Sequence, residues 1–260
     1  MTGKGVERFE LPCARAILAP IMNVFRSLKH RPFALLWTGQ TTSRLGDNLY
    51  RIALAWWVLE KTGSATAMGT VLVLSQIPML LFLLLGGVVV DRFPRIRIMF
   101  ISDVLSGLVI TFIAIFSWLN LLEIWHIYLA SIMFGLVEAF FFSAYQAVVP
   151  QITPSELWTS ANSLNGFSQR VTGIVGLALG AGLVAAGGTS ITFGLDALSF
   201  FVSALCVLPI LRENMEQSNI QGISAENVTK RTTVREALRR GLADLRGGKS
   251  ARGSVTFPHQ

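Results

Sequence analysis

Charged side chains recur at helical spacing inside segments that are otherwise apolar, and they are the residues of this sequence best suited to chemistry. In one segment, Arg44, Asp47 and Arg51 are separated by three and four residues, so they share one face of a helix. In another, Glu138 has no basic residue within a helical turn on either side. An ionisable group inside a membrane costs about 3 kcal/mol, so such positions indicate a functional site.

Proton binding is the chemistry that these residues suggest. Removal from water disfavours the charged form of a carboxylate, so we expect Glu138 to take up and release protons. Asp47 has a second interpretation, because Arg44 and Arg51 flank it and favour a permanent ion pair. Arg170, from a later apolar segment, is the expected partner of Glu138. The sequence therefore predicts that the two acids and three arginines line a proton-coupling and substrate cavity.

The other reactive residues predict no catalytic site. Asp103 and Asp196 lie about 9 Å from the nearer ends of their apolar segments, so we expect them at the membrane surface or in support of other groups. Cys13 and Cys206 have none of the neighbouring ligands that a metal site needs. The sequence contains neither a Gly-x-Ser-x-Gly nor a His-Glu-x-x-His motif. It predicts no enzyme, no cofactor and no metal.

The composition shows which elements must hold these charged groups. Hydrophobic residues make up 52% of the 260 positions and charged residues only 14%, against about a quarter in soluble domains. The mean hydropathy is +0.56. The long apolar runs lack the alternation of barrel strands, so they predict an all-α membrane protein with six transmembrane helices. The runs are about 33–59, 66–90, 97–119, 124–149, 161–187 and 190–211.

The basic residues predict how the chain is oriented in the membrane. Lysine and arginine are concentrated before the first run, between the second and third runs, and after the sixth, so these segments are expected on the cytoplasmic side. We expect a cytoplasmic leader over residues 1–31, a six-span bundle over 32–211 and a cytoplasmic tail over 212–260 with one short helix. The protein is thus expected in the plasma (inner) membrane. The net charge of +7 follows this distribution and does not indicate nucleic-acid binding.

A motif occupies the connection between the second and third runs. Gly87, Asp91, Arg92 and Arg95 form the pattern G-x-x-x-D-R-x-x-R, which resembles the signature of this loop in the major facilitator superfamily. The stretches SRLGDNLYRIALAWWVLEKTGSATAMG and FFFSAYQAVVPQITPSELWTSANSLNG resemble the branch that contains macrolide efflux proteins and the enterobactin exporter. An alternative for the loop is that its arginines only fix the orientation of the chain.

The resemblance implies both a fold and a function. It implies the N-terminal half of a transporter with two six-helix halves, each a 3+3 repeat, around a central cavity that opens to either side in turn. It also implies secondary active transport, as proton-coupled efflux of a drug-like or siderophore-like small molecule. In that fold Asp91, Arg92 and Arg95 would form a cytoplasmic latch between the halves.

A glycine-rich face is expected to pack against another helix. Gly173, Gly176 and Gly180 follow one another at steps of three and four residues, so they share a helix face. Small residues in this arrangement allow two helices to approach closely within a membrane.

The last part of the sequence bears on whether the chain acts alone. After Leu211 no further apolar run of about 20 residues follows, so the second half of the resembled fold is absent. We expect a truncated or frameshifted gene product whose partners, besides lipid, protons and substrate, are a separate C-terminal half or a second copy. The alternative is an inactive or structural membrane fragment.

Overall fold

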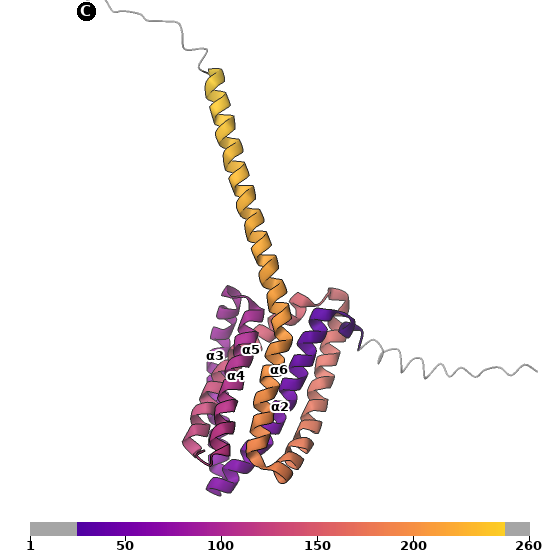
Figure 1. Cartoon of the computed structure of the whole chain (residues 1–260), viewed down its shortest axis with the longest axis vertical. Coiled ribbons are helices and arrows are strands. Elements are labelled where there is room, and N and C mark those ends of the chain that lie inside the picture. Colours follow the sequence, from indigo (N-terminus) through magenta and orange to yellow (C-terminus); the bar gives the residue numbers. More distant parts are fainter. Residues whose placement is uncertain (1–24, 248–260) are drawn as a thin grey trace, which may run out of the picture. The chain divides into compact units, whose positions relative to one another are not determined.

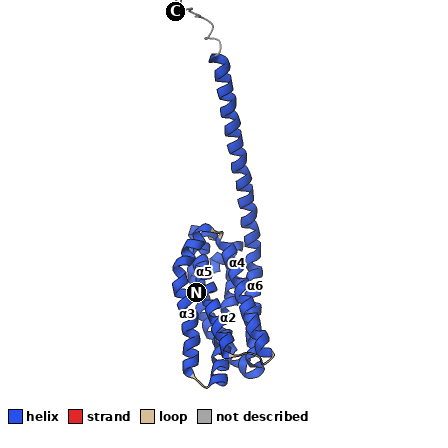
Figure 2. Cartoon of the chain, turned by 90° about the vertical axis from the view of Figure 1, so that its left-hand side faces the viewer, coloured by secondary structure: helices blue, strands red, loops and turns tan. Residues whose placement is uncertain are grey.

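The structure is a computed structural model that describes residues 25–247, with the side chains at 84–86, 88–89, 91 and 214–247 left out of the description. The described residues form helices and include no strand (Figure 2). The all-helical class predicted from the sequence is thus confirmed. The elements are η1 (Phe25–Lys29), α2 (Arg31–Thr62), α3 (Ala65–Arg92), α4 (Arg95–Trp118), α5 (Ile124–Ile152), η2 (Ser155–Leu157) and α6 (Trp158–Gly247).

Four helical segments are long and apolar enough to cross a membrane. They are Ala65–Leu83, Arg95–Trp118, Ile124–Ile152 and Ser155–Glu213. The apolar runs expected from the sequence all fall on helices, with the last two runs both on α6. Helix α2 is not among the four segments because the charged residues on one of its faces lower its mean hydropathy.

Proline and glycine mark the ends of these helices. Pro32 lies in the first turn of α2, where its missing N–H breaks no helical hydrogen bond. The same helix ends at Gly63, whose φ of 60° is left-handed and whose N–H donates to the Leu59 carbonyl at 2.8 Å. Pro94 precedes the first residue of α4, and it separates that helix from α3.

Helix α6 contains a break at Gly188, where φ is 80° and ψ is 176°. This combination is essentially restricted to glycine, because a side chain would collide with the backbone. Residues 158–187 run in the opposite direction to residues 189–211, which follow the break within the same unit (Figure 1). The long apolar segment therefore lies alongside itself as a helical hairpin.

The described backbone remains helical as far as Gly247. The chain divides into two compact units, one ending at Leu211 and one beginning at Arg212. The sequence predicted only a short helix in residues 212–260, so the helix there is longer than expected. Most of the predicted leader, residues 1–24, lies outside the described part of the chain.

Two apolar clusters occupy opposite ends of the first unit. One contains Phe33, Met99 and Val148, from the start of α2, the start of α4 and the end of α5. The other contains Val58 and Ile127, from the end of α2 and the start of α5, together with further residues of α4 and α6. A third, smaller apolar cluster of Ile110, Ala197 and Phe200 lies between α4 and the part of α6 after Gly188.

Candidate functional site

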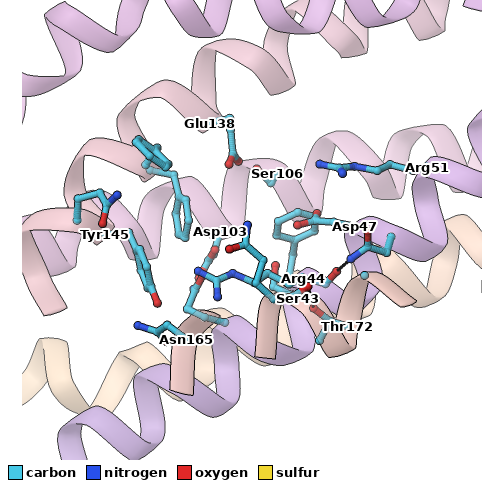
Figure 3. Close-up of a pocket in the computed structure, with 18 of the residues that line it drawn as sticks. Ser43, Arg44, Asp47, Arg51, Asp103, Ser106, Glu138, Tyr145, Asn165 and Thr172 are labelled. Atoms are coloured by element: carbon cyan, nitrogen blue, oxygen red, sulfur yellow. Dashed lines mark hydrogen bonds between the residues drawn. The ribbon is translucent and has the colours of Figure 1, made fainter. Parts of the chain in front are cut away.

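A polar cavity lies between the helices at mid-height, with a volume of about 540 Å³ (Figure 3). Most of its lining comes from α2, α5 and residues 158–187 of α6, with smaller contributions from α3, α4 and the part of α6 after Gly188. The lining residues are Gln40, Ser43, Arg44, Asp47, Asn48, Arg51, Met79, Asp103, Ser106, Glu138, Phe141, Phe142, Tyr145, Gln146, Asn162, Asn165, Gly166, Gln169, Thr172, Gly173 and Phe200.

The structure brings four of the predicted site residues to this cavity. Arg44, Asp47 and Arg51 line it from α2, and Glu138 lines it from α5 (Figure 3). Arg44, Asp47 and Arg51 lie on one face of α2 because they are separated by three and four residues, which is close to the helical period. The predicted mid-membrane stripe and the facing acid therefore meet in one polar space.

Glu138 is held without a direct partner. It makes no hydrogen bond and no ion pair within 4.0 Å with any residue that the structure describes. The positive charges of Arg51 and Arg44 act on it across the cavity, and in Figure 3 the Arg51 side chain extends toward the side where Glu138 lies. The carboxyl group is thus near cations that attract it but do not fix its position.

The expected pairing of Glu138 with Arg170 is wrong. Arg170 is exposed and lies outside the cavity lining. Its neighbour Gln169 lines the cavity, as does Gly173 four residues later. Since successive residues of a helix are rotated by about 100°, the side chain at position 170 leaves α6 from a different face.

Asp47 is close to its two flanking arginines but forms no ion pair with them. The charges of Arg51 and Arg44 act on Asp47, yet no such pair within 4.0 Å is present among these described side chains. One Asp47 oxygen, Oδ1, is buried and has no hydrogen-bond partner in the described part of the chain. The permanent ion pair considered from the sequence is therefore not formed.

Arg44 instead packs on an aromatic ring of the facing helix. Its guanidinium carbon lies 5.1 Å from the centroid of the Tyr145 ring, a cation–π geometry. Its backbone carbonyl accepts a hydrogen bond of 2.7 Å from the Asn48 side chain. These contacts hold the charged group at the cavity wall between α2 and α5.

Asp103 lines the cavity, whereas the sequence left open a position at the membrane surface or one in support of other groups. It is only 1% exposed and accepts hydrogen bonds from the Ser203 hydroxyl at 2.8 Å and from the Gln40 amide at 3.4 Å. The Gln40 amide also donates to the Ser203 hydroxyl at 2.9 Å. Of the two expected positions, the membrane surface is wrong, because depth was counted along one helix. The partners of Asp103 come from α2 and from the part of α6 after Gly188.

For Asp196 too, the expected position at the membrane surface is wrong. It is 0% exposed and lies against Gly46 of α2, where an added Cβ would be 2.5 Å from its Oδ1 atom. The hydroxyl of Ser199 lies in the same contact. The absence of a side chain at Gly46 therefore allows α2 and α6 to enclose this carboxylate completely.

The structure describes only part of the loop motif between α3 and α4. Arg95 donates a hydrogen bond of 3.2 Å to the Ala147 carbonyl of α5, whereas Gly87 and Arg92 are exposed and the Asp91 side chain is outside the described set. The latch role of this motif stays a prediction.

The glycines divide into two environments. Gly176 and Gly180 lie against α2, where an added Cβ would be 2.6 Å from Asn48 Cβ and 3.2 Å from Leu49 Cα, respectively. Gly173 has no atom near its missing Cβ and lines the cavity instead. Only two of the three predicted packing glycines therefore contact another helix.

Sequence comparison connects this arrangement with membrane transport. The profile of the family described as transmembrane secretion effector matches residues 22–243. The chain is 27% identical over 178 residues to macrolide efflux protein A from Streptococcus pyogenes, covering 67% of this chain and 43% of that protein. It is 26% identical over 222 residues to multidrug efflux pump Tap from Mycolicibacterium fortuitum, covering 83% of this chain and 51% of that protein.

A third relative is multidrug efflux pump Tap from Mycobacterium tuberculosis, 25% identical over 194 residues, with 72% of this chain and 46% of that protein covered. The chain spans about half the length of the curated relatives it matches. No solved structure matches it. The relatives are named as efflux transporters and not as enzymes. With a family match over most of its length and helices apolar enough to span a bilayer, this chain belongs to the transmembrane secretion effector family of the major facilitator superfamily.

Proposed function

We propose that this chain takes part in proton-coupled efflux of a drug-like small molecule, with substrate bound in the polar cavity and Glu138 as the proton carrier. The observation that carries the proposal is the state of Glu138. It lines the cavity, faces the charges of Arg51 and Arg44, and has no hydrogen-bond or ion-pair partner among the described residues. A proton carrier must exchange its proton, and a carboxyl group fixed in a strong pair does so poorly.

The charges of the cavity suggest how protonation is coupled to movement. When Glu138 is ionised, Arg51 and Arg44 attract it, and that attraction favours the arrangement in which α2 and α5 are close. Protonation removes the attraction, so it shifts the population toward a conformation with the helices further apart. Coupling requires only that the two conformations differ in proton affinity.

Aromatic side chains support a drug-like substrate. Phe141, Phe142 and Tyr145 line the side of the cavity formed by α5, and together they offer apolar surface next to charged groups. The related proteins named for efflux of macrolides or of multiple drugs support the same class. A siderophore-like substrate has no such support here.

The membrane arrangement that we propose has six spans as a 3+3 repeat, with both termini cytoplasmic in the inner membrane. The charged face of α2 supports its assignment as a span, because that face lines a cavity and not lipid. The match to about half of each relative supports the assignment as one half of a transporter. The motif Gly87, Asp91, Arg92 and Arg95 then lies on the cytoplasmic side, where Arg95 already bonds the end of α5.

The test measures proton flux driven by substrate. Inverted membrane vesicles containing the chain are energised, and release of luminal protons on addition of a macrolide is followed with a pH-sensitive dye. We expect substrate-dependent proton release by the native chain and its loss in Glu138→Gln. The matched control is Glu60→Gln, the same change at an exposed position near the end of α2.

Two results would contradict the proposal. Proton release that is unchanged in Glu138→Gln would remove this residue as the proton carrier. Absence of any substrate-dependent flux, both for the chain alone and after co-expression with the other half of a relative, would favour the alternative of an inactive membrane fragment.

A further inference from the structure

Asp196, a buried acid of α6, does not take part in the cavity. Asp196 is 0% exposed and does not line the cavity. Its Oδ1 atom is 3.4 Å from the Ser199 hydroxyl, which donates its stronger hydrogen bond, of 2.8 Å, to the Asp196 backbone carbonyl. Its Oδ2 atom has no partner among the described residues. An ionised carboxylate in this position would be buried with little compensation, which is costly.

A second acid lies next to it on α2. Gly46 contacts Asp196 so closely that an added Cβ would be 2.5 Å from Oδ1, and Asp47 is the next residue of the chain. The charge of Asp47 acts on Asp196. Asp47 has its own buried oxygen without a partner, Oδ1. Each of these two acids thus has one buried oxygen without a partner among the described residues.

The surroundings do not compensate two negative charges. From the described part of the chain, Asp47 and Ser199 are the groups that act on the Asp196 carboxyl, and neither is a cation. Tyr50 lies near both acids and offers only a neutral hydroxyl. On the cavity side, Arg44 and Arg51 attract Asp47, while Glu138 and Asp103 repel it.

We propose that Asp47 and Asp196 share one proton and so form a second proton-binding site, distinct from Glu138. Two adjacent carboxylates resist being ionised together, so one of them retains a proton. Binding is a simple protonation, in which a carboxylate and a proton give a carboxylic acid. Because Asp47 also lines the cavity, the pair connects the cavity with the enclosed side of α6.

The inference deepens the proposed function, but it is tested on protonation alone. The purified full chain is reconstituted in lipid, and infrared difference spectra are recorded while the pH is changed. The signal is the carbonyl-stretch band of protonated carboxyl groups. We expect one band that titrates in the native chain and that disappears both in Asp196→Asn and in Asp47→Asn. Glu60→Gln, the same kind of change at an exposed position of α2, should retain this band.

The outcomes distinguish a shared proton from a proton on one acid alone and from a bound metal cation. Retention of every titrating band in both Asp196→Asn and Asp47→Asn would overturn the proposal, and loss in Asp196→Asn alone would overturn the sharing of a proton. Displacement of the proton by sodium ions at constant pH would show a metal-cation site and overturn a site for protons only. If Asp196→Asn does not fold by circular dichroism, Asp47→Asn alone must remove the band. A failure of substrate-driven flux leaves all these spectra unaffected, so the two proposals fail independently.

Discussion

The Arg44 guanidinium lies over the Tyr145 ring, with 5.1 Å between its central carbon and the ring centroid. Arg44 belongs to α2 and Tyr145 to α5, so this pair joins the two helices that carry Asp47 and Glu138. Tyr145 is largely buried, which strengthens an interaction between a cation and an aromatic face. The pair therefore helps to hold α2 against α5 in the region that carries the two acids.

Removal of the aromatic ring should weaken the contact between α2 and α5. We predict that Tyr145→Leu lowers the stability of the purified protein by about 1–2 kcal/mol, through loss of the cation–π contact and of packing. Tyr145→Phe keeps the aromatic face and should have a much smaller effect. Thermal unfolding in detergent, followed by circular dichroism, measures both variants. Equal destabilisation by the two changes would show that the hydroxyl group matters and the ring face does not.

The Gln40, Asp103 and Ser203 network gives a second prediction. In Ser203→Ala the buried Asp103 carboxyl loses its 2.8 Å donor and keeps only the longer bond from Gln40. We expect a loss of about 1–3 kcal/mol in the free energy of unfolding, because a buried acceptor is left poorly satisfied. Ser155→Ala, an exposed position, is the matched control.

The double variant distinguishes a network from independent contacts. Ser203→Ala combined with Asp103→Ala should cost less than the two single changes together, because each single change already removes the same bond. Strict additivity would contradict the network.

Two glycines of α6 should respond oppositely to the same substitution. In Gly176→Ala the new Cβ would be 2.6 Å from Asn48 Cβ, so α2 and α6 must separate, and we expect destabilisation of about 1–3 kcal/mol. Gly182 has no atom within 4 Å of the corresponding position, so Gly182→Ala should raise the melting temperature through better helix propensity. If both substitutions shifted the melting temperature in the same direction, close packing of α2 and α6 would be ruled out as the role of Gly176.

The start of α5 depends on a histidine. The Glu123 N–H donates to His126 Nδ1 at 3.1 Å, while the imidazole stacks on Trp125 with 3.7 Å between ring centroids. In His126→Phe the stacking surface remains but the acceptor is lost, so we predict destabilisation of about 1 kcal/mol. His126→Asn retains a polar acceptor and should recover part of that loss in thermal unfolding.

Residues that lie on one helix were the most accessible to sequence reasoning. Arg44, Asp47 and Arg51 could be assigned to one face because the helical period alone decides it. Glu138 could be added because an unpaired acid in an apolar run is costly unless it serves a function. Arg170 could not be assigned correctly, because the rotation of α6 about its own axis depends on packing with α2.

Partners that are distant in the sequence could not be predicted. The contacts of Asp103 with Gln40 and Ser203 span 63 and 100 residues, respectively. Asp196 meets α2 only because Gly46 has no side chain. A single sequence contains the residue types that form these contacts, but the positions of the helices decide which of them meet.

The conformation of Gly188 has a consequence for genetic variation. Every codon for glycine is one base change from codons for alanine, valine, an acid or a larger residue, and none of these residues tolerates φ of 80° with ψ of 176° without about 1–3 kcal/mol of strain. Gly187 has an ordinary backbone, and an added Cβ there would meet only the Ile191 side chain, at 3.0 Å. In a survey of natural or laboratory variants, missense changes at codon 188 should therefore be depleted relative to codon 187. The helical hairpin thus predicts a position that does not tolerate substitution although it lies outside the cavity lining.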